Sequence, residues 1–108
     1  MDPHLQAAHA VCTELLDLLA KPLSADSVAN GWTEEARKHF YQRIGALNDA
    51  LAAGDIAVDP TRYRDMSIPR EMDNWGITPE DSLMDRAAVL SQHVRAVARS
   101  HMPESPQA

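Results

Sequence analysis

Two side chains of metal-ligand type, His9 and Cys12, lie three residues apart near the start of the chain. On a helix this spacing places both on one face. A zinc site needs four ligands, or three and a water molecule. His4 lies one turn away, but the chain has a single cysteine and no second close ligand pair. Because Cys12 also falls among apolar residues, we expect a buried, unreactive thiol, no metal and no other cofactor.

A second pattern with chemical potential is Arg95 followed by His101 near the end of the chain. This spacing resembles the Arg-x(4–6)-His signature of the HEPN superfamily, a group of small all-α proteins that includes ribonucleases. The resemblance implies that Arg95 and His101 act together on an RNA phosphate. The family's usual polar residue after the arginine is Ala96 here. The competing interpretation is that both cationic side chains complement a helix C-terminus.

A third pattern, Asp81-Ser82-Leu83, is similar to the Asp-Ser-Leu at which acyl carrier proteins take phosphopantetheine on the serine. Carrier proteins follow this serine with two further helices, whereas 26 residues follow Ser82. Asp and Ser are also common at helix starts, and the acidic pairs Glu34-Glu35 and Glu80-Asp81 fit helix first turns equally well. We therefore expect capping rather than chemistry at these positions.

The composition predicts a single helical domain. The 108 residues include seventeen alanines and ten leucines against six valines and four isoleucines, which favours helix over strand. A chain of this length builds one core, which we place in residues 1–102, with a frayed tail over 103–108. No apolar run approaches the length of a membrane span, so we expect no membrane association.

Periodic apolar residues and capping residues define three helices. The first runs from about Asp2 to Ala20, the second from Thr33 to about Gly54, and the third from Thr78 to about Met102. Ser24 can begin a short turn of helix between the first two. An antiparallel three-helix bundle follows, in which an irregular, partly helical segment between helices 2 and 3, residues 55–77, crosses from one to the other.

Segment 55–77 carries the candidate binding residues. Asp59-Pro60 can start a short helix through Met66, and Pro69 blocks regular pairing nearby. The segment is rich in side chains that dominate protein interfaces. We predict a partner-binding role for five of them: Arg62, Tyr63, Arg64, Arg70 and Trp75. The competing interpretation is that Tyr63 and Trp75 belong to the core at one end of the bundle.

The charge balance indicates the kind of partner. Ten basic against sixteen acidic residues give a formal net charge of −6, and the bases form no cluster. Nucleic-acid binding is therefore disfavoured, unless one face of a dimer collects Arg37, Lys38 and Arg43. We expect a non-catalytic protein-binding module for a partner with a basic surface, such as an inhibitor, an immunity-type neutraliser or an accessory subunit of a bacterial complex. We place it in the cytoplasm and expect a homodimer, because long Ala-rich helices leave apolar surface that three helices do not cover. The alternative is a HEPN-like ribonuclease that uses Arg95 and His101.

Overall fold

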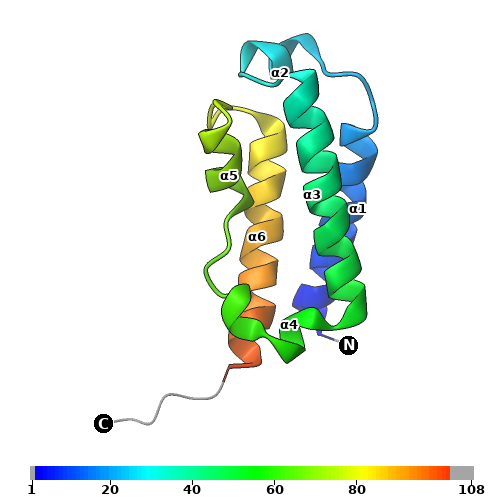
Figure 1. Cartoon of the computed structure of the whole chain (residues 1–108), viewed down its shortest axis with the longest axis vertical. Coiled ribbons are helices and arrows are strands. Elements are labelled where there is room, and N and C mark those ends of the chain that lie inside the picture. The colour runs from blue at the N-terminus through cyan, green and yellow to red at the C-terminus, as the bar shows by residue number, and fades with distance from the viewer. Residues whose placement is uncertain (1, 103–108) are drawn as a thin grey trace, which may run out of the picture.

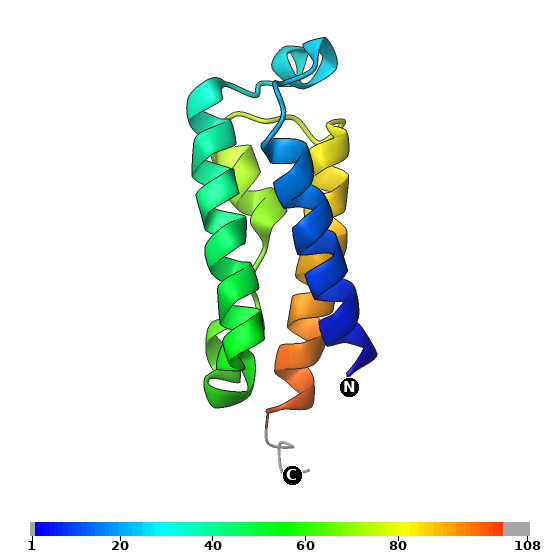
Figure 2. The same ribbon diagram turned by 90° about the vertical axis from the view of Figure 1, so that its right-hand side faces the viewer.

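The computed structural model describes residues 2–102, which are all-helical, as the composition predicts. Three long helices, α1 (Pro3–Leu19), α3 (Glu34–Ala53) and α6 (Ser82–Ser100), lie side by side (Figures 1 and 2). The shorter elements are α2 (Ala25–Ala29), α4 (Asp55–Val58), the 3₁₀ helix η1 (Pro60–Arg62) and α5 (Ile68–Asn74). The predicted tail over 103–108 lies outside the described residues.

Local capping explains where the first helices begin and end. The carboxylate of Asp2 accepts a hydrogen bond from the His4 amide, and Pro3 occupies the first turn of α1. Thr33 caps α3 in the same way through its hydroxyl, and Gly54 ends α3 with a left-handed φ of 79°. Ser24 begins α2 by accepting from the Ser27 amide. All four positions confirm the ends predicted from sequence.

The apolar stripes of the long helices meet in one core. The buried side chains of α1 and α3 follow the helical spacing of their apolar residues: Ala8, Cys12, Leu15, Leu19, Ala36, Phe40, Ile44, Leu47 and Leu51. The stripe of α6 joins them through Leu90, Val94 and Val97. Aromatic rings are few, so Trp32 and Phe40, whose ring centroids lie 5.7 Å apart, supply much of the volume at the α2 end.

Helix α1 runs antiparallel to both other long helices. Near its start, Nδ1 of His9 lies 2.9 Å from Oδ1 of Asn48, which belongs to the last turns of α3. Nδ1 of His4 lies 2.9 Å from Nδ1 of His93, in the second half of α6. The N-terminal end of α1 therefore sits beside the C-terminal ends of its two neighbours (Figure 1).

Helices α3 and α6 point in the same direction, which differs from the predicted antiparallel bundle. Trp32, just before α3, donates a hydrogen bond to Asp81, just before α6, so both helices start at the same end. Because α3 ends at one end of the bundle and α6 begins at the other, the chain between them has to return along the whole bundle. Residues 54–81 make that return, and Figure 1 shows α5 beside α6.

The returning segment is more helical than expected. Asp59-Pro60 starts a short helix as expected, but this helix is a single 3₁₀ turn, η1, which spans Pro60–Arg62 and ends before Met66. The preceding helix α4 ends at Val58. Pro69 does not interrupt regular structure, because it lies in the first turn of α5, where no amide donor is needed. Helix α5 then packs against α6.

The capping residue of α6 lies three residues later than the expected Thr78. Asp81 caps this helix, and its carboxylate accepts from the Leu83 amide at 2.9 Å. The Thr78 amide instead donates a hydrogen bond to the backbone carbonyl of Asn30, at 2.8 Å. Within residues 2–102, no helix combines the length and hydropathy needed to cross a bilayer.

Candidate functional site

The five predicted binding residues divide into two groups in space. Arg62, Tyr63 and Arg64 lie at η1, at the end of the bundle where α3 stops and α4 begins. Trp75 is the C-cap residue of α5, near the opposite end, and Arg70 lies on α5 between the two groups. The structure therefore does not gather the five side chains into one site.

Tyr63 belongs to the core rather than to an exposed binding surface. Its side chain is buried, and the Arg62 guanidinium lies 5.8 Å from the centre of its ring. Both residues line a groove of about 430 Å³ against α3, which also includes Arg43 and Met66. Arg64 is exposed and pairs with its neighbour Asp65 at 3.1 Å. At this end of the segment, Arg62 and Arg64 are thus exposed to solvent, whereas the ring of Tyr63 is buried.

Trp75 is the exposed aromatic residue of the segment. The residue is 43% exposed, and its indole stacks on His39 of α3, with the ring centroids 4.6 Å apart and the planes 25° apart. The ring of Phe40 meets it edge-on at 6.0 Å. Two contacts from α3 therefore hold a large apolar surface in one orientation while nearly half of it faces solvent.

Two polar contacts fix α5, which carries Trp75, against its neighbours. The Ser91 hydroxyl of α6 is buried and accepts from the first amide of α5, that of Ile68, at 3.0 Å. Arg43 of α3 forms an ion pair with Glu71, with Nε and Oε1 2.9 Å apart. Arg70, on the same helix, is exposed and makes no ion pair within the described residues. Trp75 and Arg70 consequently project from a helix that is held on both sides.

Arg95 and His101, the residues of the HEPN-like pattern, have separate surroundings. The Arg95 guanidinium is part-buried and donates to the backbone carbonyl of Met66 at 2.9 Å. This contact ties the returning segment to α6. His101 is the exposed C-terminal cap of α6. Arg95 therefore helps to hold the returning segment against α6. The ribonuclease activity stays a prediction.

Cys12 is fully buried in the core. Burial disfavours the thiolate and raises the pKa of the Cys12 thiol to about 12. The neighbouring His9 makes its hydrogen bond to Asn48 on α3. Within residues 2–102, no three His, Cys, Asp or Glu side chains gather in a way that would hold a metal ion.

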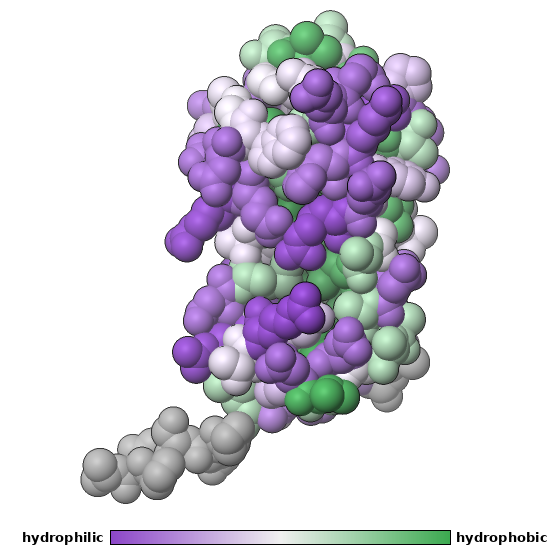
Figure 3. Space-filling view, viewed as in Figure 1, coloured by the Kyte–Doolittle hydropathy of each residue, from purple (hydrophilic) through white to green (hydrophobic). Residues whose placement is uncertain are grey.

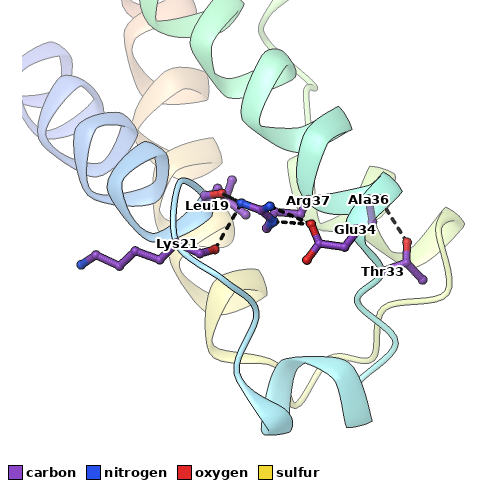
Figure 4. Close-up of polar contacts among 6 residues, drawn as sticks. All are labelled: Leu19, Lys21, Thr33, Glu34, Ala36 and Arg37. Carbon is purple, nitrogen blue, oxygen red and sulfur yellow. Dashed lines mark hydrogen bonds and ion pairs between the residues drawn. The ribbon is translucent and has the colours of Figure 1, made fainter.

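Arg37 joins α1 to α3 at the α2 end of the bundle (Figure 4). Its Nη1 donates to the carbonyls of Leu19 and Lys21, at 3.0 and 3.3 Å, and so caps the end of α1. Its Nε and Nη2 bind Oε2 of Glu34. Of the three bases that one face of a dimer would have to collect for nucleic-acid binding, Arg37 and Arg43 form ion pairs, with Glu34 and Glu71 respectively. The expectation that nucleic-acid binding is disfavoured stays a prediction.

The Asp81 carboxylate forms a buried junction that the sequence analysis missed. It is 1% exposed and accepts three hydrogen bonds: from the Leu83 amide, from Trp32 Nε1 at 2.9 Å and from Asn30 Nδ2 at 3.2 Å. The signal was present, since Asp at a helix start and a tryptophan that needs an acceptor are both visible in the sequence. Asp81 therefore caps α6 and also cross-links the starts of α3 and α6.

The remaining exposed apolar side chains come from different elements. Val28, Tyr41, Val58 and Val89 belong to α2, α3, α4 and α6 respectively. Figure 3 shows that hydrophilic residues cover most of one face, with hydrophobic residues at its two ends and in the gaps. Scattered exposure of this kind is ordinary for a protein surface. Trp75 differs from these side chains in its size and in the stacking that fixes it.

The chain matches no protein-family model, no curated protein and no solved structure.

Proposed function

We propose that the chain is a non-catalytic protein-binding module that acts as an inhibitor, an immunity-type neutraliser or an accessory subunit of a bacterial complex. The observation that supports this proposal most is the exposed, stacked indole of Trp75. Tryptophan is enriched among the residues that carry binding energy at protein interfaces. An indole already held by His39 and Phe40 loses little conformational freedom when a partner covers it.

The exposed arginines of the segment provide polar contacts at two separate places, one near Trp75 and one at the other end of the bundle. Arg70 lies on the same helix as Trp75, and Arg64 and Arg62 continue the segment toward α4. Elsewhere the surface is dominated by acids, and the net charge of −6 favours a partner with a basic surface. On this proposal, long-range attraction speeds encounter while Trp75 determines how long the complex lasts.

The same proposal includes a cytoplasmic location and a homodimer. The free, buried Cys12 suits a reducing compartment. A second copy can cover apolar side chains that the long helices leave exposed, such as Val89 of α6. Light scattering on the purified chain measures the oligomeric state directly, and a monomer at all concentrations contradicts the dimer.

The experiment that tests the binding role compares three variants. The tagged chain is used to co-purify a partner from native cells, and the affinity of the identified partner is then measured for each variant. Trp75→Ala is expected to weaken binding by about thirty-fold, the effect of losing a hot spot of about 2 kcal/mol. Arg64→Ala is expected to cost about two- to five-fold, because its charge is solvated.

Tyr41→Ala is the matched control, since Tyr41 is an aromatic residue with a similar exposed fraction, 45%, on another part of the surface. It should leave the affinity unchanged. Far-ultraviolet circular dichroism should show the same helicity in all three variants. If Trp75→Ala unfolds the chain, or if it binds as well as the Tyr41 variant, the proposed binding surface is wrong.

A further inference from the structure

Two histidines, His4 of α1 and His93 of α6, meet near the end of the bundle where α1 begins (Figure 2). They are 89 positions apart in the chain, and their Nδ1 atoms lie 2.9 Å apart. The ring centroids are 5.2 Å apart and the ring planes are tilted by 42°, so the rings meet through their nitrogen atoms rather than face to face. Two atoms of the commonest metal-ligating side chain are thus directed at each other between two helices.

The packing of α1 against α6 holds the backbones that carry both rings. His4 lies in the first turn of α1, and its backbone amide donates to the Asp2 carboxylate at 2.8 Å. One turn further along α1, Ala8 is fully buried, and so is Val94, the neighbour of His93 on α6. Sites on packed helices are positioned more precisely than sites on loops. The two rings are therefore close together before any ligand is bound.

The separation of the two nitrogens indicates a coordination geometry. An imidazole nitrogen lies about 2.0–2.1 Å from the zinc ion that it binds, and we use the same length for copper. Two such nitrogens on one ion are about 2.9 Å apart at a right angle, and about 3.3 Å apart at the tetrahedral angle. The observed 2.9 Å matches the right angle. Right angles between neighbouring ligands are typical of the square-planar and tetragonal complexes of Cu²⁺, whereas Zn²⁺ prefers a tetrahedron.

We propose that His4 and His93 form a Cu²⁺ site that joins the start of α1 to α6. Each Nδ1 gives a lone pair to the ion, and both rings then carry their hydrogen on Nε2. In the part of the chain that the structure describes, no third His, Cys, Asp or Glu side chain joins the pair, so water molecules complete the coordination. His4 is exposed and His93 is half-buried, which gives water access to the ion. This site goes beyond the protein-binding function proposed above and does not depend on Trp75.

The test adds Cu²⁺ to the full chain at neutral pH and follows binding by calorimetry and electron paramagnetic resonance. We expect saturation at one ion per chain and an axial spectrum with splitting from two imidazole nitrogens. The Tm should rise with the Cu²⁺ concentration, because the ion binds the folded chain and joins two of its helices. Cys12, the single cysteine of the chain, is fully buried, so its thiol does not compete for the ion.

Two substitutions, His4→Ala and His93→Ala, each remove one ligand. Each should weaken Cu²⁺ binding at least about ten-fold, since even the loss of a group that only orients a ligand costs about 10–100-fold. Each should also abolish the rise in Tm. Without added metal both variants should keep their helicity, because the Asp2 cap uses the backbone amide of residue 4. His101→Ala is the matched control: it removes an imidazole from another exposed position and should leave Cu²⁺ binding unchanged.

Three results would overturn the proposal. The first is binding that does not saturate or a spectrum without nitrogen splitting. The second is equal weakening by His101→Ala and by the two ligand variants, which would indicate non-specific binding to histidine. The third is full-strength binding by His93→Ala, which would mean that His4 binds the ion together with the amino group of the chain. Trp75→Ala should bind Cu²⁺ as the unaltered chain does, so failure of the Trp75 surface and failure of this site are distinct outcomes.

Discussion

Asp81→Ala is expected to be among the most damaging single substitutions at the α2 end of the bundle. It removes the carboxylate that caps α6 at the Leu83 amide, and the loss of a cap costs about 1 kcal/mol. It also leaves Nε1 of Trp32, which is 2% exposed, without an acceptor, at a cost of about 1–3 kcal/mol. The hydrogen bond from Asn30 is longer and nearer to solvent, so we assign only a small free-energy cost to its loss.

The sum is a loss of about 2–4 kcal/mol in the free energy of unfolding, which corresponds to a fall in Tm of roughly 10–20 °C. Domains of this size are stable by about 5–15 kcal/mol, so the variant should still fold at room temperature. The measurement is urea unfolding followed by far-ultraviolet dichroism. In a Trp75→Phe background, the fluorescence of Trp32 reports on the junction itself.

Two further variants separate the cap from the cross-link. Asp81→Asn keeps an oxygen acceptor and a good capping residue, so its loss should be about 1 kcal/mol or less. Asp85→Ala removes an exposed acid from the first turn of the same helix and should cost under about 0.5 kcal/mol. If Asp81→Ala is no more destabilising than Asp85→Ala, the buried junction does not hold the two helix starts together.

Two other predictions concern Cys12 and Gly31. Because the Cys12 thiol has a pKa of about 12 in the folded chain against 9.0 as its ordinary value, only the unfolded chain loses this proton between pH 9 and pH 12. The free energy of unfolding should therefore fall with rising pH in that window by up to about 1.4 kcal/mol per unit, and urea midpoints of Cys12→Ala should show a shallower slope. Gly31 has a φ of 103°, and a Cβ there would lie 2.2 Å from the carbonyl oxygen of Gly76. Gly31→Ala should thus destabilise the chain distinctly more than Gly54→Ala. A Cβ at Gly54 meets open space, so only its left-handed backbone is strained, at a cost of about 1–2 kcal/mol. Equal urea midpoints for the two variants would contradict this reasoning.

The sequence determined what depends on neighbours within one or two helical turns. Asp2, Ser24, Thr33 and Gly54 each act on an amide or carbonyl a few residues away, so their capping roles were readable without a fold. The apolar periodicity of α1 and α3 was readable for the same reason, because it is fixed by the number of residues per turn. The burial of Cys12 followed from its place in such a stripe.

Only the tertiary structure decided the features that join distant parts of the chain. Apolar periodicity is identical whichever way a helix points, so it did not show that α3 and α6 run parallel. Helix α6 starts at Asp81 because Trp32 and Asn30, about fifty residues earlier, surround that carboxylate. Likewise, the burial of Tyr63 and the exposure of Trp75 depend on which residues of other helices pack against them. His39 of α3, for example, stacks on Trp75. Such outcomes depend on which surfaces meet when the helices pack, and spacing along a single segment carries no information about that.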